Sequence, residues 1–194
     1  MMAVQLLDPH IETQPQAPIT GEDLARLGDI GPSELIKGEI VYMSPTGFWH
    51  GRIENRIGSL IERFVRSNDL GEVFSGEVGI YTQRNPDTIR AADVGFVSRG
   101  RLAQVKSKSY LDVAPELVVE ILSPDDRWSD LTDKLDEYFA IGVNLIWVVD
   151  PRRKQVYVYR SVTDVQRLSV EETLTGGEAL PGFSVPVAEL FAME

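Results

Sequence analysis

Two apolar runs, each interrupted by a single acidic residue, constrain this chain more than any other feature of its sequence. The run IRAADVGFV contains Asp93, and the run PELVVEILSP contains Glu120. Nearly continuous apolar runs of this length are typical of strands that are covered on both faces of a sheet. A carboxylate in such surroundings is costly unless it is paired or bound to a metal. The two runs therefore predict neighbouring buried strands that bring two carboxylates together.

The segment SDLTDKLDEY, which follows the second run, adds a lysine to these two acids. Leu131, Leu135 and Tyr138 recur at helical spacing, so Lys134 is expected on a helix that is capped by Ser129 or Asp130. From that helix the long side chain of Lys134 can reach back to the strand ends and bring one positive charge to the site.

Two acids at the same level of adjacent strands, which lie about 4.8 Å apart, can share one cation. Mg²⁺ prefers an octahedral shell of oxygen ligands at about 2.0–2.1 Å. We therefore predict a Mg²⁺ site, or a Mn²⁺ site, formed by Asp93, Glu120 and the backbone carbonyl of Ile121. Such a cation lowers the pKa of a bound water and neutralises a phosphodiester being cut, while Lys134 activates the water or stabilises the transition state.

The composition favours one globular domain and excludes several kinds of chemistry. The 194 residues are 43% hydrophobic and 25% charged, which is ordinary for a folded domain with a core. The absence of cysteine excludes disulfides, thiolate nucleophiles and cysteine-based zinc sites. A net charge of −11 argues against a general nucleic-acid binder, although a bound cation changes the local sign. Without a secretory signal or an apolar run of about 20 residues, a cytoplasmic location is expected.

The order of the predicted elements indicates a mixed α/β (α+β) fold. Residues 1–19 are expected to form a flexible arm, and residues 20–194 a single domain. Thr20 is the expected cap of a first helix, and Lys37-Gly38 is the turn of an N-terminal β-hairpin. A long helix is expected over about 49–67, with Gly71 just beyond its end. Strands, a helix carrying Lys134, further strands and a short last helix follow.

Several of these segments resemble, in order, the Uma-two family of restriction-endonuclease-like proteins. They are ELIKGEIVYMSP, the start of the long helix at His50, AADVGFVS, PELVVEILSPDDRWSD, DKLDEYFAIGVNLIWVVDP and VYVYR. The resemblance spans about residues 20–192 and implies a PD-(D/E)xK nuclease fold, a mixed central sheet flanked by helices, with a Mg²⁺-dependent site. It implies that Asp93 and Glu120 are the two acids of the motif and Lys134 its lysine. Ala92 stands where the motif has proline, and Leu122 where it has lysine, so the role of the lysine falls to Lys134.

Further residues are auxiliary candidates. Glu39, His50 and Glu54 are candidate metal ligands or phosphate contacts, and one loop is a candidate DNA-facing surface through Arg99, Arg101, Lys106 and Lys108. Each choice has a structural alternative. Asp93 can satisfy a turn amide, Lys134 can pair with Asp130 in solvent, and the basic loop can simply be solvated.

The leading hypothesis is a Mg²⁺-dependent endonuclease that hydrolyses DNA and forms a homodimer. One alternative is a non-catalytic protein of the nuclease fold that binds nucleic acid or a protein partner. Another is a structural dimer module whose apolar strands and tryptophans are buried between subunits.

Overall fold

A computed structural model describes residues 17–124 and 126–192 of the chain. The helices are α1 (Gly21–Arg26), α2 (Phe48–Asn68), α3 (Arg99–Leu102), α4 (Trp128–Ala140) and α5 (Val187–Phe191). The strands are β1 (Ser33–Ile36), β2 (Glu39–Tyr42), β3 (Gly71–Gln83), β4 (Thr88–Ser98), β5 (Leu117–Ile121), β6 (Leu145–Asp150), β7 (Gln155–Tyr159), β8 (Val165–Leu168), β9 (Thr173–Thr175) and β10 (Ser184–Pro186).

Within these residues, eight strands form one mixed sheet, and β9 and β10 form a small second sheet. The main order is β2-β1-β4-β5-β6-β7-β8, and β3 pairs with β4 beside this path. Strands β5 and β6 are parallel, whereas the other neighbours are antiparallel. The parallel pair is connected through α4, as a parallel connection requires a crossover. This architecture confirms the mixed sheet with an N-terminal hairpin.

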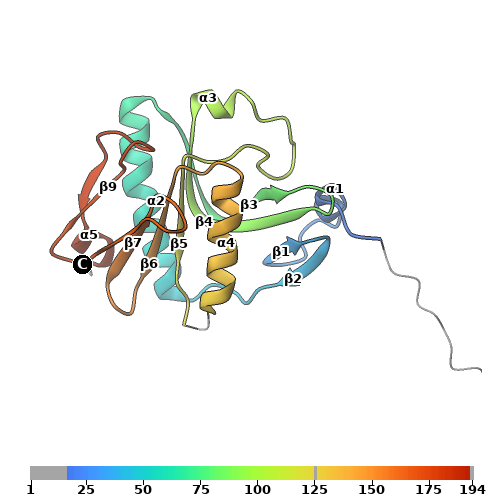
Figure 1. Ribbon diagram of the computed structural model, residues 1–194, viewed down its shortest axis with the longest axis horizontal. Coiled ribbons are helices and arrows are strands. Elements are labelled where there is room, and N and C mark those ends of the chain that lie inside the picture. Colours follow the sequence, from blue (N-terminus) through green and yellow to red (C-terminus); the bar gives the residue numbers. More distant parts are fainter. Residues whose placement is uncertain (1–16, 125, 193–194) are drawn as a thin grey trace, which may run out of the picture.

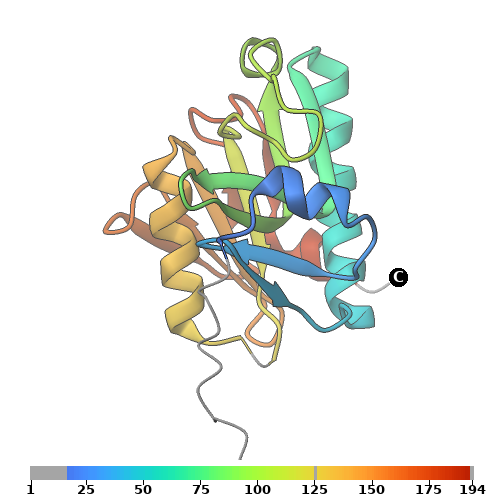
Figure 2. The same ribbon diagram turned by 90° about the vertical axis from the view of Figure 1, so that its right-hand side faces the viewer.

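The sheet lies between α2 and α4, which cover opposite faces (Figure 1). Figure 2 shows the three layers, with α4 (yellow to orange) and α2 (teal) on either side of the strands. Ile53, Ile57, Ile61 and Val65 form the buried stripe of α2 at the spacing the sequence predicts. Each such side chain contributes roughly 1.5–3 kcal/mol when fully buried, so this stripe anchors α2 to the sheet. The C-terminal segment packs against the same side of the sheet through Leu174, Phe183 and Leu190 among others.

Strand β4 changes its neighbour halfway along its length. Near its start it pairs with β1 at Leu35↔Ile89, and from Val94 onward it pairs with β5. Strand β3 follows its other edge and bends at Gly76, which has φ of 91° and lies in a register shift between Ser75 and Val78. The backbone around Ala91 therefore faces a gap between β1 and β5. Buried backbone groups in such a gap need side-chain partners.

Several predicted ends and turns are confirmed. Thr20 caps α1 through a capping box with Asp23. Lys37 and Gly38 form the turn between β1 and β2, both with positive φ. The Asn85-Pro86-Asp87 turn joins β3 to β4 in a second hairpin.

The bounds of α2, Phe48–Asn68, confirm the long helix predicted over about 49–67. The left-handed residue that ends it is Asp69 and not Gly71, because aspartate tolerates that conformation. The predicted caps of the helix that carries Lys134 are wrong. Helix α4 begins at Trp128 after Arg127, so neither Ser129 nor Asp130 is its N-cap.

The predicted arm over residues 1–19 lies mostly outside the described residues. Its last part is tied down, since the Ile19 N–H donates to the Gly38 carbonyl at 2.9 Å. Ile19 also packs against the buried cluster that contains Leu24 and Leu35. None of the described helices is long and apolar enough to cross a membrane.

Candidate active site

Asp93 and Glu120 lie opposite each other at the point where β4 and β5 begin to separate. The ladder pairs Val94 with Val119, so Asp93 and Glu120 are the next residues along the two antiparallel strands. Both are buried. The Asp93 Oδ2 accepts the N–H of Ile121 at 2.6 Å. The ladder between β4 and β5 ends at Val94 and Val119, so this side-chain bond satisfies a backbone N–H that has no ladder partner on β4. The predicted neighbouring strands and the common level of the two acids are confirmed.

Glu120 is bonded to two residues of α4. Its Oε1 accepts the Tyr138 hydroxyl at 2.9 Å, and its Oε2 lies 3.3 Å from the Lys134 Nζ. Burial raises the pKa of Glu120 to about 7, although Lys134 opposes this shift. Asp93 raises the pKa further because like charges disfavour a second ionisation. Glu120 is therefore an acid whose charge depends on which cations surround it.

Lys134 fills the gap between β1 and β5. Its Nζ donates to the Ala91 carbonyl at 3.0 Å and forms an ion pair at 3.0 Å with the Glu34 Oε1, besides its contact with Glu120. Burial alone would lower the pKa of Lys134, but Glu120 and Glu34 outweigh it and raise the pKa. The raised pKa keeps the Lys134 side chain a charged ammonium beside Glu120 and Glu34.

Glu34 on β1 and Arg90 on β4 also belong to this cluster, and neither stood out in the sequence. The Glu34 Oε1 accepts the Ala91 N–H at 3.0 Å, and its Oε2 accepts from Arg90 at 3.0 Å. Burial would raise the pKa of Glu34, yet the charge of Lys134 and these bonds lower it. Arg90 also binds Glu137 through two donors at 2.7 Å. The sequence signal for the buried Glu34–Arg90 pair is a single acid in the segment SELI and a single arginine in the segment IRAAD.

Two auxiliary candidates approach from α2. His50 and Glu54 are one helical turn apart. The His50 Nε2 lies 3.4 Å from the Asp93 Oδ2. Its Nδ1 is buried and has no hydrogen-bond partner in the described part of the chain. The Glu54 Oε1 accepts the Gly76 N–H at 2.6 Å, and burial raises its pKa with a further contribution from nearby Asp93. These two side chains therefore stand beside Asp93, whereas the third candidate, Glu39, is exposed on β2 and pairs with Ile36 in the hairpin.

A cavity of 290 Å³ opens at the cluster and is lined by Glu34, Arg90, Glu120, Ile121 and Lys134 among others. Its lining holds the Glu34 and Glu120 carboxylates, which suit a hard divalent cation, together with the cationic Arg90 and Lys134. Among the described residues, no three His, Asp or Glu side chains already form a metal-binding set. A cation would hence draw on Asp93, Glu120, the Ile121 carbonyl and water.

The candidate DNA-facing loop lies at the other end of β4. Arg99 follows Asp93 by six residues, or about 20 Å of strand, and α3 and its loop stand far from the β5–α4 connection (Figure 1). Arg99 pairs with Asp69. Arg101 binds the carbonyls of Ala114 and Pro115 and pairs with Glu116, so it secures the loop. Lys106 and Lys108 are exposed. The structure does not bring these four residues to the acids.

The fold and the cluster define a restriction-endonuclease-like architecture: a mixed sheet between helices, with two acids and a lysine buried where two strands separate. Residues 22–188 match the Uma2 family, described as "Putative restriction endonuclease", and the chain belongs to this family. A crystal structure of a protein from Anabaena variabilis, described as "a putative nuclease belonging to DUF820", has the same fold with a TM-score of 0.75. The two are 22% identical over 90% of this chain and 98% of that one. No curated protein matches the sequence.

Proposed function

We propose that this protein is a divalent-metal-dependent endonuclease that hydrolyses DNA phosphodiester bonds at a PD-(D/E)xK-type site. The observation that carries the proposal is the meeting of Asp93, Glu120 and Lys134 in one buried cluster. Membership of a family described as restriction endonucleases supports the same activity.

The chain's own residues have separate roles in this proposal. Asp93, Glu120 and the Ile121 carbonyl would hold Mg²⁺ or Mn²⁺, which when bound neutralises phosphate charge and lowers the pKa of a water ligand. Lys134 presents a fixed ammonium that stabilises negative charge developing on the phosphate. Tyr138 holds one oxygen of Glu120, and His50 stands against Asp93. In this proposal Lys134 acts through its positive charge, 3.3 Å from the Glu120 carboxylate.

Plasmid nicking with Mg²⁺ or Mn²⁺ tests this proposal. The wild type should convert supercoiled plasmid to nicked circles, EDTA should stop the reaction, and Glu120→Gln should lower the rate at least a hundredfold. Glu39→Gln is the matched control, since it makes the same change at an exposed position. Thermal melting checks that both variants fold. Cleavage that survives either EDTA or Glu120→Gln would refute the proposal.

One observation favours a non-catalytic alternative. Both acids are already bonded within the protein, and no three-residue metal set exists among the described residues. A protein of the nuclease fold that only binds nucleic acid would bind DNA in a salt-sensitive manner, without metal-dependent turnover.

A homodimer would suit a nuclease that cuts both strands. Sedimentation at micromolar concentration tests this, and it also tests the alternative of a structural dimer module.

A further inference from the structure

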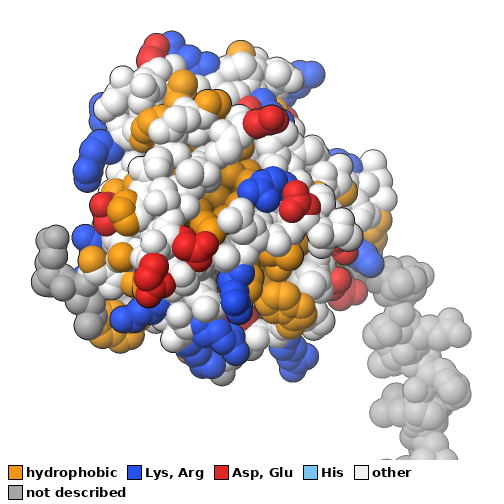
Figure 3. Space-filling model, turned by 60° about the vertical axis from the view of Figure 1, so that its left-hand side comes forward, with side chains coloured by type: hydrophobic (Ala, Val, Ile, Leu, Met, Phe, Trp, Pro, Cys, Tyr) orange, Lys and Arg blue, Asp and Glu red, His pale blue; other side chains and the backbone are white. Residues whose placement is uncertain are grey.

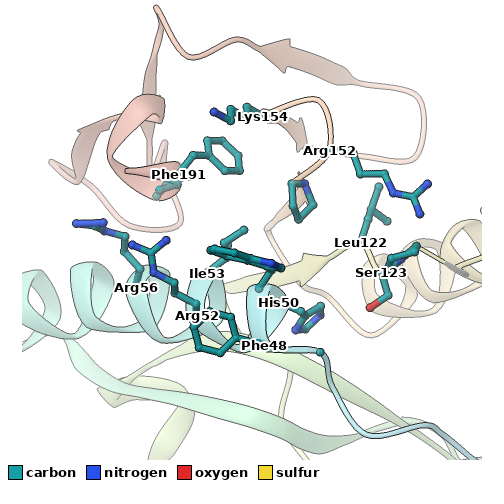
Figure 4. A pocket seen from close by; sticks show the side chains of 15 residues that line it. Phe48, His50, Arg52, Ile53, Arg56, Leu122, Ser123, Arg152, Lys154 and Phe191 are labelled. Carbon is teal, nitrogen blue, oxygen red and sulfur yellow. The ribbon is translucent and has the colours of Figure 1, made fainter. Parts of the chain in front are cut away.

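A second cavity, of 410 Å³, opens beside the candidate active site on the α2 side. Its walls come from four places in the chain: the start of α2, residues 122–124, the turn between β6 and β7, and α5. Figure 4 shows Phe191 and Lys154 on one side of it, Phe48 and Arg52 of α2 on the other, and Leu122 and Arg152 at one end. A cavity of this size is in the range of small-ligand sites.

Two exposed aromatic side chains stand at its rim. Phe48 and Trp49 are 75% and 58% exposed, and their rings meet edge to face with centroids 5.1 Å apart. The Arg52 guanidinium lies 5.8 Å from the Trp49 ring. Neither ring contributes to the buried clusters, so core packing does not explain the pair. Adjacent large aromatics left in solvent commonly mark a binding surface.

Cations surround the same cavity. Arg152 and Lys154 are exposed in the β6–β7 turn, and no carboxylate in the described part of the chain forms an ion pair with either side chain. Lys154 has φ of 49°, a conformation that favours Asn or Gly. The geometry of the turn therefore does not explain why this residue is a lysine. Figure 3 shows Lys and Arg side chains gathered beside exposed hydrophobic groups toward the lower edge of the molecule. In a chain of net charge −11, this local excess of positive charge is a distinct feature.

The cavity adjoins the reacting groups. His50 lines it and also contacts the Asp93 carboxylate. Leu122 lines both this cavity and the one that contains Glu120 and Lys134. A ligand that enters here therefore lies next to the candidate site, on the other side of the Ile121–Leu122 segment.

We infer that this cavity binds an unpaired nucleotide next to the phosphodiester to be cut, with the base against Trp49 and Phe48 and the neighbouring phosphates near Arg152 and Lys154. The inference rests on the proposed function and specifies its substrate as nucleic acid with a single-stranded or extruded nucleotide. Aromatic faces beside cations suit this ligand, because bases outside a duplex expose a face for stacking while the backbone keeps its charge. A paired base hides both faces within the duplex, and it would have to leave the stack to enter the cavity.

Fluorescence anisotropy of wild-type protein in EDTA tests the inference, because binding is then measured without cleavage. The probes are a labelled oligothymidylate, a blunt duplex of the same length, and that duplex with one unpaired nucleotide. We expect the single strand to bind at least tenfold more tightly than the blunt duplex, and the unpaired nucleotide to strengthen duplex binding. Equal or tighter binding of the blunt duplex, or no binding of the single strand, would overturn the inference.

Matched variants separate the groups that bind the base from those that bind the backbone. Trp49→Ala should weaken single-strand binding about tenfold, Trp49→Phe should restore most of it, and Tyr42→Ala is the control at another exposed aromatic. Lys154→Asn removes a charge at a position that suits asparagine, and it should reduce the salt dependence by about 0.7 in the log–log slope. Lys37→Asn makes the same change at another exposed turn lysine, which has φ of 50°, and should leave the slope unchanged. A Trp49→Ala effect no larger than that of Tyr42→Ala would overturn the inference.

The outcomes also separate this inference from the proposed function. Metal-dependent plasmid nicking without single-strand preference would overturn the inference alone. Single-strand binding that depends on Trp49, in a protein that does not cleave, would overturn the proposed activity alone.

Discussion

The two sides of the sheet near Glu120 differ in how far their charged and polar groups are satisfied. On the α4 side, Glu34, Arg90, Glu120 and Lys134 are all bonded to one another or to the backbone. On the α2 side, the His50 Nδ1 has no partner in the described residues. The neighbouring cavity is lined by exposed aromatics and by Arg152 and Lys154, and neither of these two cations forms an ion pair with a carboxylate in the described part of the chain. The difference indicates that the two sides have different roles. The α4 side holds charges in fixed positions, and the α2 side presents groups that can still bind a ligand.

The largest effect on stability is expected from removing Lys134, the cation at the centre of the α4 side. Lys134→Met should lower the free energy of unfolding by about 3–5 kcal/mol, because it leaves Glu34 and Glu120 buried without their shared partner. Urea denaturation measures the change, and Lys106→Met is the control at an exposed lysine. Adding Glu120→Gln to Lys134→Met should recover part of the loss. A loss below about 1 kcal/mol would mean that the α4 side is not held together by this charge.

A metal titration asks whether the bonded acids can still accept a cation. At a hundred times its dissociation constant, Mg²⁺ or Mn²⁺ should stabilise the wild type by about 2.7 kcal/mol, because it binds only the folded state. For a chain of this length each kcal/mol raises the thermal midpoint by roughly 2–4 °C. Thermal melting should show this rise for the wild type but not for Asp93→Asn. The same rise in both proteins would place the cation elsewhere.

The smallest effect on stability is expected on the α2 side. His50→Gln should change the free energy of unfolding by less than about 1 kcal/mol, since one ring nitrogen has no partner and the contact with Asp93 is long at 3.4 Å. Urea denaturation measures this, in parallel with Lys134→Met. A cost as large as that of Lys134→Met would erase the distinction between the two sides.

The sequence predicted most of the fold because its signals are local. The apolar stripe of α2, the Lys37-Gly38 turn, the Thr20 cap and the two apolar runs each depend on residues within a few positions of one another. Helix ends were less predictable. Arg127 caps α4 without a side-chain bond, and a left-handed Asp69 ends α2, so neither end carries the residue that usually marks it.

The candidate site was predictable only in part. Asp93 and Glu120 stand out because a charge inside an apolar run has few explanations. Glu34 does not stand out, since its four-residue strand is too short to show which face is buried. The cavity beside His50 carries no sequence signal either, because its lining comes from segments as distant as Trp49 and Phe191.

By itself the sequence determined that two acids lie on neighbouring buried strands and that a lysine follows on a helix. The tertiary structure decided what surrounds them. Strand β4 exchanges β1 for β5 as its neighbour, and this leaves a gap in which the Ala91 backbone is satisfied by Glu34 and Lys134. Those partners are 57 and 43 residues away along the chain. The requirement that buried backbone groups be hydrogen-bonded is general, but which side chains meet it depends on how distant segments pack.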